Sequence, residues 1–440
     1  MTYQDALNYL YTRTPLFQNQ GQGAYKEGLS NTLALDAHFG HPHRAYKTIH
    51  VAGTNGKGSV SHTLASILQE AGYRVGLYTS PHLVDFRERI RVNGEMIPKR
   101  RVIDFVRKEK TFFEPLYPSF FEVVTALAFK YFEEQKVDVA VIEVGLGGRL
   151  DCTNIIQPEF CVITNISFDH VALLGDTLAK IASEKAGIIK QHTPVVVGEH
   201  TDETRPVFEG KANSLHSPII FAEDTPQTAP FDVELKGLCQ QKNTNTLLHC
   251  LPFLRQSFPK VTEQHIRDGF AHVIENTHLM GRWQTLRTRP TVVCDTGHNV
   301  GGFQYIVAQL KTYQTHPLTP PKGGACIDSP IVTTSSPWGR HGEGSAALRI
   351  VLGMVNDKDV SGVLSMLPKY ATYYFTQASV ARALPAVEMQ QKAAAFGLEG
   401  RSFPTVAAAY RAALSDASPD DFIFVGGSTF VVADLLSARK

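Results

Sequence analysis

The sequence lacks several features that would point to particular classes of protein. Its six cysteines contain no Cys-x-x-Cys pair, which argues against zinc, and they are too few for a disulfide framework in 440 residues. No apolar run is long enough to span a bilayer, and residues 1–10 do not resemble a secretory signal. The formal net charge of +1 gives no general attraction to nucleic acid or to membrane surfaces. We therefore expect a cytoplasmic protein with neither nucleic-acid nor membrane partners.

The chain is long enough for two domains. Its 43% hydrophobic and 19% charged residues are typical of globular proteins. In the first half, β-like runs alternate with helical segments. We expect strands at 46–52, 74–79, 138–144, 160–165 and 194–198, and helices at 60–71, 121–135 and 178–190. This alternation predicts an α/β fold with a mostly parallel sheet covered by helices on both faces.

The second half repeats the pattern and predicts a smaller Rossmann-like α/β domain. Its expected strands are 291–295, 348–354, 370–376 and 422–425, and its expected helices are 302–313, 360–367, 386–396, 406–414 and a segment from residue 429. We place the boundary near Arg287–Pro290, which gives domains of residues 1–288 and 289–440. Residues 316–347 are rich in Pro, Gly, Ser and Thr, and we expect a low-complexity surface insertion there.

A glycine-rich loop follows the first expected strand. Its residues are Gly53, Thr54, Asn55, Gly56, Lys57, Gly58 and Ser59. Small residues let backbone N–H groups close around phosphate oxygens, and a helix N-terminus adds partial positive charge. The spacing departs from the usual P-loop, because Gly58 separates the lysine from the hydroxyl of Ser59. The strand before the loop and the helix after it favour a nucleotide site over a turn that binds nothing.

Polar residues also follow other expected strands. Ser80 comes after 74–79, Glu143 closes the run Asp-Val-Ala-Val-Ile-Glu at 138–143, and His170 lies just past 160–165. The carboxyl ends of parallel strands share one edge of the sheet, where ligands bind. An acidic residue beside a triphosphate suits Mg²⁺, which prefers oxygen ligands. We therefore expect these side chains to converge with Lys57.

Four further residues are candidates, and the first two have competing interpretations. Lys185 lies in an apolar helix, where spacing alone favours a surface lysine whose stem covers apolar groups. Arg282 precedes the second domain and is either a phosphate clamp or an ordinary linker residue. Asp295 and His298 lie in Asp-Thr-Gly-His-Asn at a strand end, which indicates a site rather than packing.

Taken together, these motifs resemble one family. The sequence contains, in order, Gly-Thr-Asn-Gly-Lys-Gly-Ser, Thr-Ser-Pro-His-Leu, Glu-Val-Gly-Leu-Gly-Gly-Arg-Leu-Asp, Ser-Phe-Asp-His, Glu-Lys-Ala-Gly-Ile, Gly-Arg-Trp-Gln and Asp-Thr-Gly-His-Asn. The combination is similar to the folylpolyglutamate synthase/dihydrofolate synthase family of the Mur ligase superfamily, and the irregular loop spacing is that family's own form. The resemblance covers the whole chain apart from the insertion.

The resemblance implies an ATP-dependent ligase with a P-loop NTPase-like, Mur-type ATP-binding domain and a C-terminal glutamate ligase domain. Ser80, Glu143 and His170 match Mg²⁺ ligands, and Lys185 matches a lysine that is carbamylated to support a second Mg²⁺. Asn243, Arg282 and Asp295 match nucleotide contacts, and His298 matches a residue near the reaction centre. The implied substrates are ATP, L-glutamate, dihydropteroate and reduced folates, and the implied state is a monomer. Residues 14–26 are either part of the pterin pocket or a polar loop.

Other functions remain open at this point. A Mur-type ligase acting on a cell-wall precursor would use the same chemistry on a different acceptor. A P-loop kinase or switch ATPase would not need a second domain carrying Asp295 and His298. A nucleotide-binding protein without catalysis is disfavoured by the intact candidate metal and phosphate residues.

Overall fold

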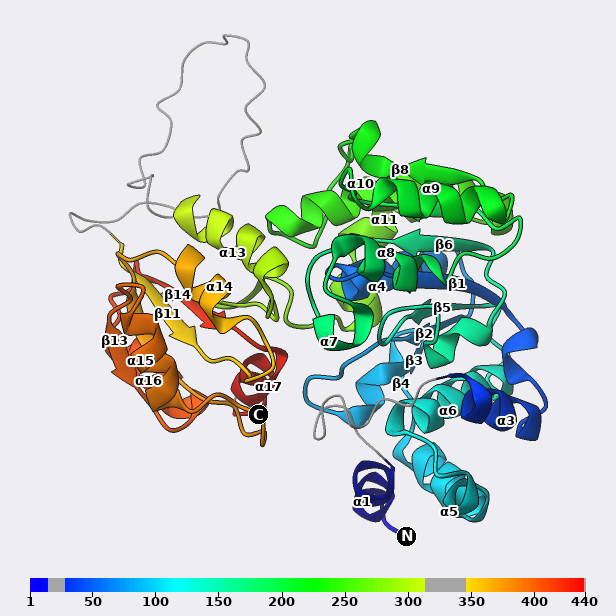
Figure 1. Ribbon diagram of the computed structural model, residues 1–440, viewed down its shortest axis with the longest axis horizontal. Coiled ribbons are helices and arrows are strands. Elements are labelled where there is room, and N and C mark those ends of the chain that lie inside the picture. Colours follow the sequence, from blue (N-terminus) through cyan, green and yellow to red (C-terminus); the bar gives the residue numbers. More distant parts are fainter. Residues whose placement is uncertain (15–27, 313–345, 439–440) are drawn as a thin grey trace.

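The computed structural model describes residues 1–14, 28–312 and 346–438. These residues form two α/β domains, each built around one β-sheet (Figure 1). The predicted insertion at 316–347 and the predicted pterin or polar loop at 14–26 lie, apart from their end residues, outside the described residues.

The larger, N-terminal domain contains an eight-stranded sheet with the order β4-β3-β2-β5-β1-β6-β7-β8. Its strands are β1 (Lys47–Ala52), β2 (Val75–Tyr78), β3 (Ile90–Val92), β4 (Glu95–Met96), β5 (Val139–Glu143), β6 (Phe160–Ile163), β7 (Val195–Val197) and β8 (Ile219–Phe221). The sheet is parallel except at the edge, where β3 pairs antiparallel with both β2 and β4. The mostly parallel sheet predicted from the sequence is confirmed.

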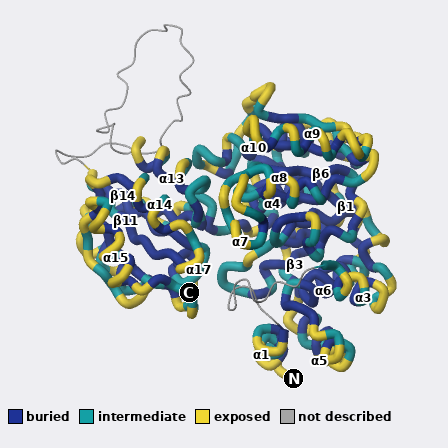
Figure 2. The backbone as a smooth tube through the Cα atoms, viewed as in Figure 1, coloured by how far each residue is buried: buried dark blue, intermediate teal, exposed yellow. Residues whose placement is uncertain are grey.

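Helices cover both faces of this sheet. Successive strand residues point to opposite sides, and here both sets are apolar, so each face packs against helices. Val139 and Val141 of β5 pack in the layer of α4 (Lys57–Glu70), α10 (Leu238–Ser257) and α11 (Glu263–Ala271). Ala140 and Ile142 pack in the opposite layer with α5 (Lys99–Leu116) and α6 (Phe120–Glu134), and α8 (Leu178–Ala186) and α9 (Arg205–Ser214) pack with alternate residues of β6 and β7. The strands are accordingly buried, as Figure 2 shows.

Shorter elements complete this domain. They are α1 (Tyr3–Arg13), α3 (Ser30–His38), η2 (Pro42–Arg44), η3 (Phe86–Arg89), η4 (Cys152–Ile155), α7 (Val171–Leu174), η5 (Ala222–Asp224) and α12 (Val273–Thr277). Among the residues that the structure describes, no helix has the length and apolar character needed to cross a membrane.

The C-terminal domain contains a six-stranded sheet with the order β13-β12-β11-β14-β10-β9. Its strands are β9 (Gln284–Thr288), β10 (Thr291–Cys294), β11 (Leu348–Leu352), β12 (Thr372–Phe375), β13 (Gly400–Ser402) and β14 (Phe422–Gly426). One apolar layer contains α13 (Val300–Thr312), α14 (Val360–Met366) and α15 (Ala386–Ala394), and the other contains α16 (Val406–Ser415) and α17 (Thr429–Ser437). Only β9 runs antiparallel to its neighbour, so the predicted Rossmann-like domain is also confirmed.

Some helix ends and the domain boundary in the structure differ from those predicted. The helix after the glycine-rich loop begins at Lys57 rather than Val60, because Gly56, with φ 87°, caps it directly. The helix predicted over 178–190 ends at Ala186. The division predicted between residues 288 and 289 falls inside the β9–β10 hairpin, because β9 pairs antiparallel with β10. We therefore propose that the C-terminal domain begins at Gln284.

Candidate active site

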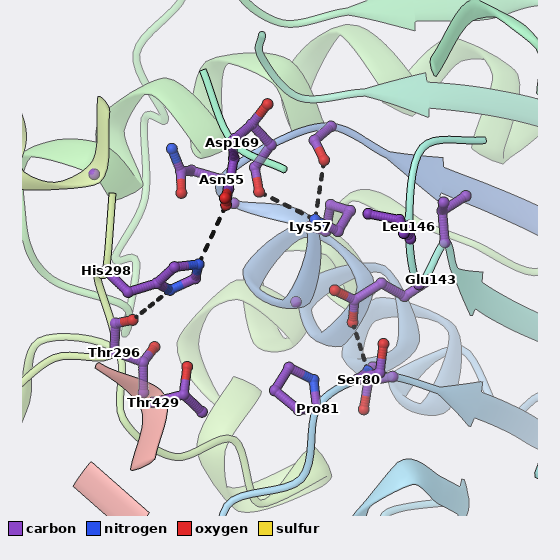
Figure 3. A pocket seen from close by; sticks show the side chains of 18 of the residues that line it. Asn55, Lys57, Ser80, Pro81, Glu143, Leu146, Asp169, Thr296, His298 and Thr429 are labelled. Carbon is purple, nitrogen blue, oxygen red and sulfur yellow. Dashed lines mark hydrogen bonds and ion pairs between the residues drawn. The ribbon is translucent and has the colours of Figure 1, made fainter. Parts of the chain in front are cut away.

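A cavity of about 400 Å³ lies between the two domains, at the carboxyl ends of the strands of the larger sheet. Side chains from both domains line it, as Figure 3 shows for Lys57, Glu143 and Ser80 facing His298 and Thr296. The strand-end residues that the sequence predicted to converge, namely Lys57, Ser59, Ser80, Glu143 and His170, all line this cavity.

The glycine-rich loop folds tightly because two of its positions exclude a side chain. A Cβ on Gly53 would lie 1.9 Å from Thr164 Oγ1, and Gly53 has φ +138°. A Cβ on Gly56 would lie 2.2 Å from Asn243 Oδ1, and Gly56 has φ +87°. These contacts explain the glycine pattern, and they place Asn243 beside the loop, as a nucleotide contact requires.

Lys57 lies at the first turn of α4, inside the loop. Its Nζ donates to the backbone oxygens of Gly53 at 2.9 Å and Thr54 at 3.0 Å. Burial lowers the pKa of Lys57, whereas the charges of Glu143 and Asp169 act in the opposite direction. The ammonium group is therefore held at the helix N-terminus, where anionic phosphate groups are favoured.

Ser59 carries an unsatisfied hydroxyl in the same turn. Its side chain is 1% exposed, and its Oγ has no hydrogen-bond partner among the described residues. A buried hydroxyl without a partner costs about 1–3 kcal/mol. A phosphate oxygen or a metal ion in the cavity would supply the missing partner.

Glu143 ends β5 and points into the cavity. Its Oε2 accepts a hydrogen bond from the backbone N–H of Ser80 at 3.3 Å, which brings two predicted metal ligands together (Figure 3). Burial raises the pKa of Glu143, whereas the positive charges of Lys57 and Arg282 lower it. The carboxylate thus lies in a buried site that a further cation would stabilise.

His170 follows β6 and begins α7 in the left-handed conformation, with φ 50°. Burial lowers its pKa to about 3, so the ring is neutral at pH 7, the form that binds metal ions. Within the described ranges, no cluster of three or more His, Cys, Asp or Glu side chains could hold a metal by itself. Ser80 and Glu143 offer the oxygen donors that Mg²⁺ prefers, and His170 lines the same cavity.

Lys185 is not the surface residue that helical spacing alone favoured. It is 5% exposed, and its Nζ donates to the backbone oxygen of Gly53 at 2.9 Å. Burial, together with the positive charge of Lys57, lowers the pKa of Lys185 to about 7. The structure therefore places this amine in the cavity against the phosphate loop.

The predicted nucleotide contacts from the second half also line the cavity. Arg282 donates to the Thr296 hydroxyl and, at 3.3 Å, to the Gly281 oxygen. Asp295 accepts backbone hydrogen bonds from Trp283 at 2.7 Å and Gly297 at 2.8 Å, and burial raises its pKa. These bonds join the segment before β9 that carries Arg282 to the segment after β10 that carries Asp295.

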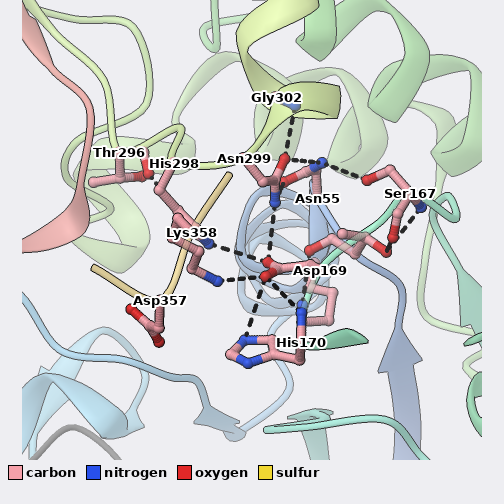
Figure 4. Close-up of polar contacts among 12 residues, drawn as sticks. Asn55, Ser167, Asp169, His170, Thr296, His298, Asn299, Gly302, Asp357 and Lys358 are labelled. Atoms are coloured by element: carbon pink, nitrogen blue, oxygen red, sulfur yellow. Dashed lines mark hydrogen bonds and ion pairs between the residues drawn. The ribbon is translucent and has the colours of Figure 1, made fainter. Parts of the chain in front are cut away.

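The sequence analysis missed two residues of the site, Asp169 and Lys358. Both His298 and Lys358 contact the carboxylate of Asp169 (Figure 4). Asp169 Oδ2 lies 3.3 Å from His298 Nε2, and Lys358 forms an ion pair with Oδ1. Burial would raise the pKa of Asp169, but the hydrogen bond and charge of His298 and the charge of Lys358 hold it well below its usual range. The sequence contains only weak indications of these two residues: Asp169 directly precedes the predicted ligand His170, and Lys358 follows the end of the strand β11.

The fold and site define an ATP-dependent ligase of the Mur type: a phosphate-loop domain and a smaller α/β domain that share one cavity. The model of the Mur ligase middle domain matches residues 51–244. The chain is 31% identical to the dihydrofolate synthase/folylpolyglutamate synthase of Escherichia coli K12, over 94% of this chain and 92% of that protein. The chain belongs to the dihydrofolate synthase/folylpolyglutamate synthase family.

Two further comparisons agree with this assignment. A probable bifunctional folylpolyglutamate synthase/dihydropteroate synthase of Haloferax volcanii is 31% identical over 99% of this chain, which spans 50% of that longer protein. The structure of E. coli FolC in complex with DHPP and ADP has a TM-score of 0.81 and 29% identity, covering 100% of this chain and 98% of that chain. The family resemblance predicted from the motifs is confirmed.

Proposed function

We propose that this chain uses ATP to join L-glutamate to dihydropteroate and to reduced folates that already carry glutamate. The observation that carries the proposal is the shared cavity, in which a phosphate loop with Lys57 and Ser59 faces Arg282, Asp295 and His298. The relatives' names supply the substrate class, and their similarity extends over both domains.

The carboxylate of the pterin substrate is a poor electrophile and needs activation. One of its oxygens attacks the γ-phosphorus of ATP, so that an acyl phosphate forms and ADP leaves. Lys57 and the N-terminus of α4 offset the negative charge on the phosphoryl group, and the loop N–H groups position it. The main contributions are therefore electrostatic and positional.

Ser80, Glu143 and His170 would hold one Mg²⁺ in this cavity, with Ser59 available to its ligands or to phosphate. Bound there, Mg²⁺ would neutralise charge on the phosphate groups. Lys185 also contacts the loop, through the Gly53 oxygen, and its amine has a pKa of about 7. We propose that CO₂ converts this amine to a carbamate, which would replace a cation by an anionic oxygen ligand for a second Mg²⁺.

The amine of L-glutamate then attacks the acyl carbon, and the tetrahedral intermediate expels phosphate to leave the amide. An acyl phosphate hydrolyses readily, so the second domain must exclude water from the reacting atoms. We propose that Arg282, Asp295 and Asn243 bind the nucleotide and that His298 lies at the reaction centre. Among the residues that the structure describes, Cys152, Cys161, Cys239 and Cys250 are free thiols, which supports the proposed cytoplasmic location.

An ADP-release assay tests the substrate proposal. Wild-type protein with ATP, Mg²⁺ and L-glutamate is expected to release ADP when dihydropteroate or tetrahydrofolate is added, and not when both acceptors are omitted. Release with one acceptor would define its specificity. Absence of release with both, from folded protein that binds ADP, would overturn the folate assignment and favour another acceptor, such as a cell-wall precursor.

A further inference from the structure

One contact between the domains beside the cavity is made by polar side chains that bind one carboxylate directly or through Asn299. We call the set Asn55, Asp169, His298, Asn299 and Lys358 the interdomain junction. Asn55 and Asp169 come from the N-terminal domain, and the other three come from the C-terminal domain (Figure 4).

Asp169 is the centre of the junction. Its Oδ1 forms the ion pair with Lys358, and its Oδ2 accepts from Asn299 Nδ2 at 3.1 Å and faces His298 Nε2 at 3.3 Å. The side chains of Asp169 and Lys358 are only 10% and 8% exposed. Separation of the domains would return both charges to water, whereas loss of one partner in the docked state would leave a buried charge unpaired.

The interdomain junction also contacts the phosphate loop and the backbone of His170. The amides of Asn55 and Asn299 exchange two hydrogen bonds, each 3.1 Å long, so the phosphate loop is joined directly to the C-terminal domain. Asp169 Oδ1 accepts from the backbone N–H of His170 at 2.9 Å. The carboxylate that binds Lys358 therefore also orients the backbone of a proposed metal ligand.

We propose that Lys358 is a positioning residue for ligation: its ion pair with Asp169 docks the C-terminal domain on the loop of His170 and fixes that loop in the geometry used for the reaction. Lys358 lies between β11 and α14 and reaches the cavity from the domain opposite the phosphate loop. The proposal rests on the proposed ligase function, and it assigns to Lys358 an action through Asp169 rather than on the substrate.

The test compares Lys358→Met, which keeps the length of the side chain without its charge, with Lys358→Arg and with the wild type. Misplacement of reacting groups by about 1 Å costs on the order of 100-fold in rate, so we expect Lys358→Met to lower kcat by about that factor. The KM for L-glutamate should change by less than about twofold, because no substrate contact is removed. Lys358→Arg should recover most of kcat.

Small-angle X-ray scattering of each variant with ADP and Mg²⁺ provides a second readout. Lys358→Met should show a larger radius of gyration than the wild type, and Lys358→Arg should not. Lys392→Met is the matched control, because Lys392 is a half-exposed lysine of α15 whose ion pair among the described residues, with Glu388, lies within its own helix. It should match the wild type in both measurements.

A double-mutant cycle completes the design. If the pair acts as a unit, Asp169→Asn combined with Lys358→Met should be no worse than the more damaging single variant. Unchanged kcat in Lys358→Met would overturn the proposal. So would a raised KM for L-glutamate with an unchanged scattering curve, since Lys358 would then contact the substrate. If the wild type releases no ADP with either folate acceptor, the proposed function is wrong. The scattering comparison still tests whether the ion pair docks the domains.

Discussion

Replacement of Lys185 by alanine should strongly reduce the rate of ligation while leaving the fold intact. The amine is buried against the phosphate loop, and its pKa is about 7. At pH 8 about 90% of such an amine is neutral, compared with about 0.4% of a lysine with the usual pKa of about 10.4. Only the neutral amine attacks CO₂, so the structure raises the reactive fraction roughly 200-fold.

The sign of the pH dependence follows from the lowered pKa. Protonation below pH 7 removes the nucleophilic lone pair, so at a fixed concentration of dissolved CO₂ the carbamate should decrease as the pH falls through 7. Carbon-13 NMR of protein incubated with labelled bicarbonate measures it directly. We expect one carbamate signal in the wild type at pH 8, a weaker signal at pH 6, and none in Lys185→Ala.

Lys190→Ala is the matched control for this experiment. Lys190 lies shortly after the same helix, its pKa is also lowered by burial, and its Nζ donates to the Asn154 oxygen at 2.8 Å, away from the cavity. This variant should keep both the signal and the activity. Lys185→Ala should lose at least about 10- to 100-fold in turnover, as for loss of a metal-supporting group. Full activity in Lys185→Ala, or a carbamate signal that survives it, would refute the reasoning.

Three other outcomes follow from the site and the core. Lys57→Ala should lower ATP-dependent turnover by about 10³-fold or more with an unchanged thermal midpoint, and near-normal turnover would contradict its phosphate role. Glu143→Gln should raise the Mg²⁺ concentration needed for half-maximal activity by at least about 10-fold, as a metal titration would show. Phe303→Ala removes a ring that is 0% exposed and should reduce the free energy of unfolding by about 3–5 kcal/mol in urea titrations; a loss below 1 kcal/mol would argue against this packing.

The sequence predicted the fold well where its signals are local. Apolar runs identified β1, β5 and β10, and the strand–helix alternation predicted both parallel sheets. Short or polar elements were not predicted, among them the edge strands β3 and β4 and the strand β9. The burial pattern of β9 is mostly exposed, so it carries little hydrophobic signal, and only its pairing with β10 assigns it to the second sheet.

The phosphate loop and the convergence of strand ends were determined by the sequence itself. The glycines at 53 and 56 are required by local backbone conformation and close contacts, and parallel strands that end in polar residues must deliver them to one edge of the sheet. Tertiary structure alone decided the surroundings of Lys185 and the pairing of Lys358 with Asp169. A helical pattern does not reveal whether a lysine faces water or a cavity, and an ion pair between residues far apart in the chain exists only after the two domains have docked.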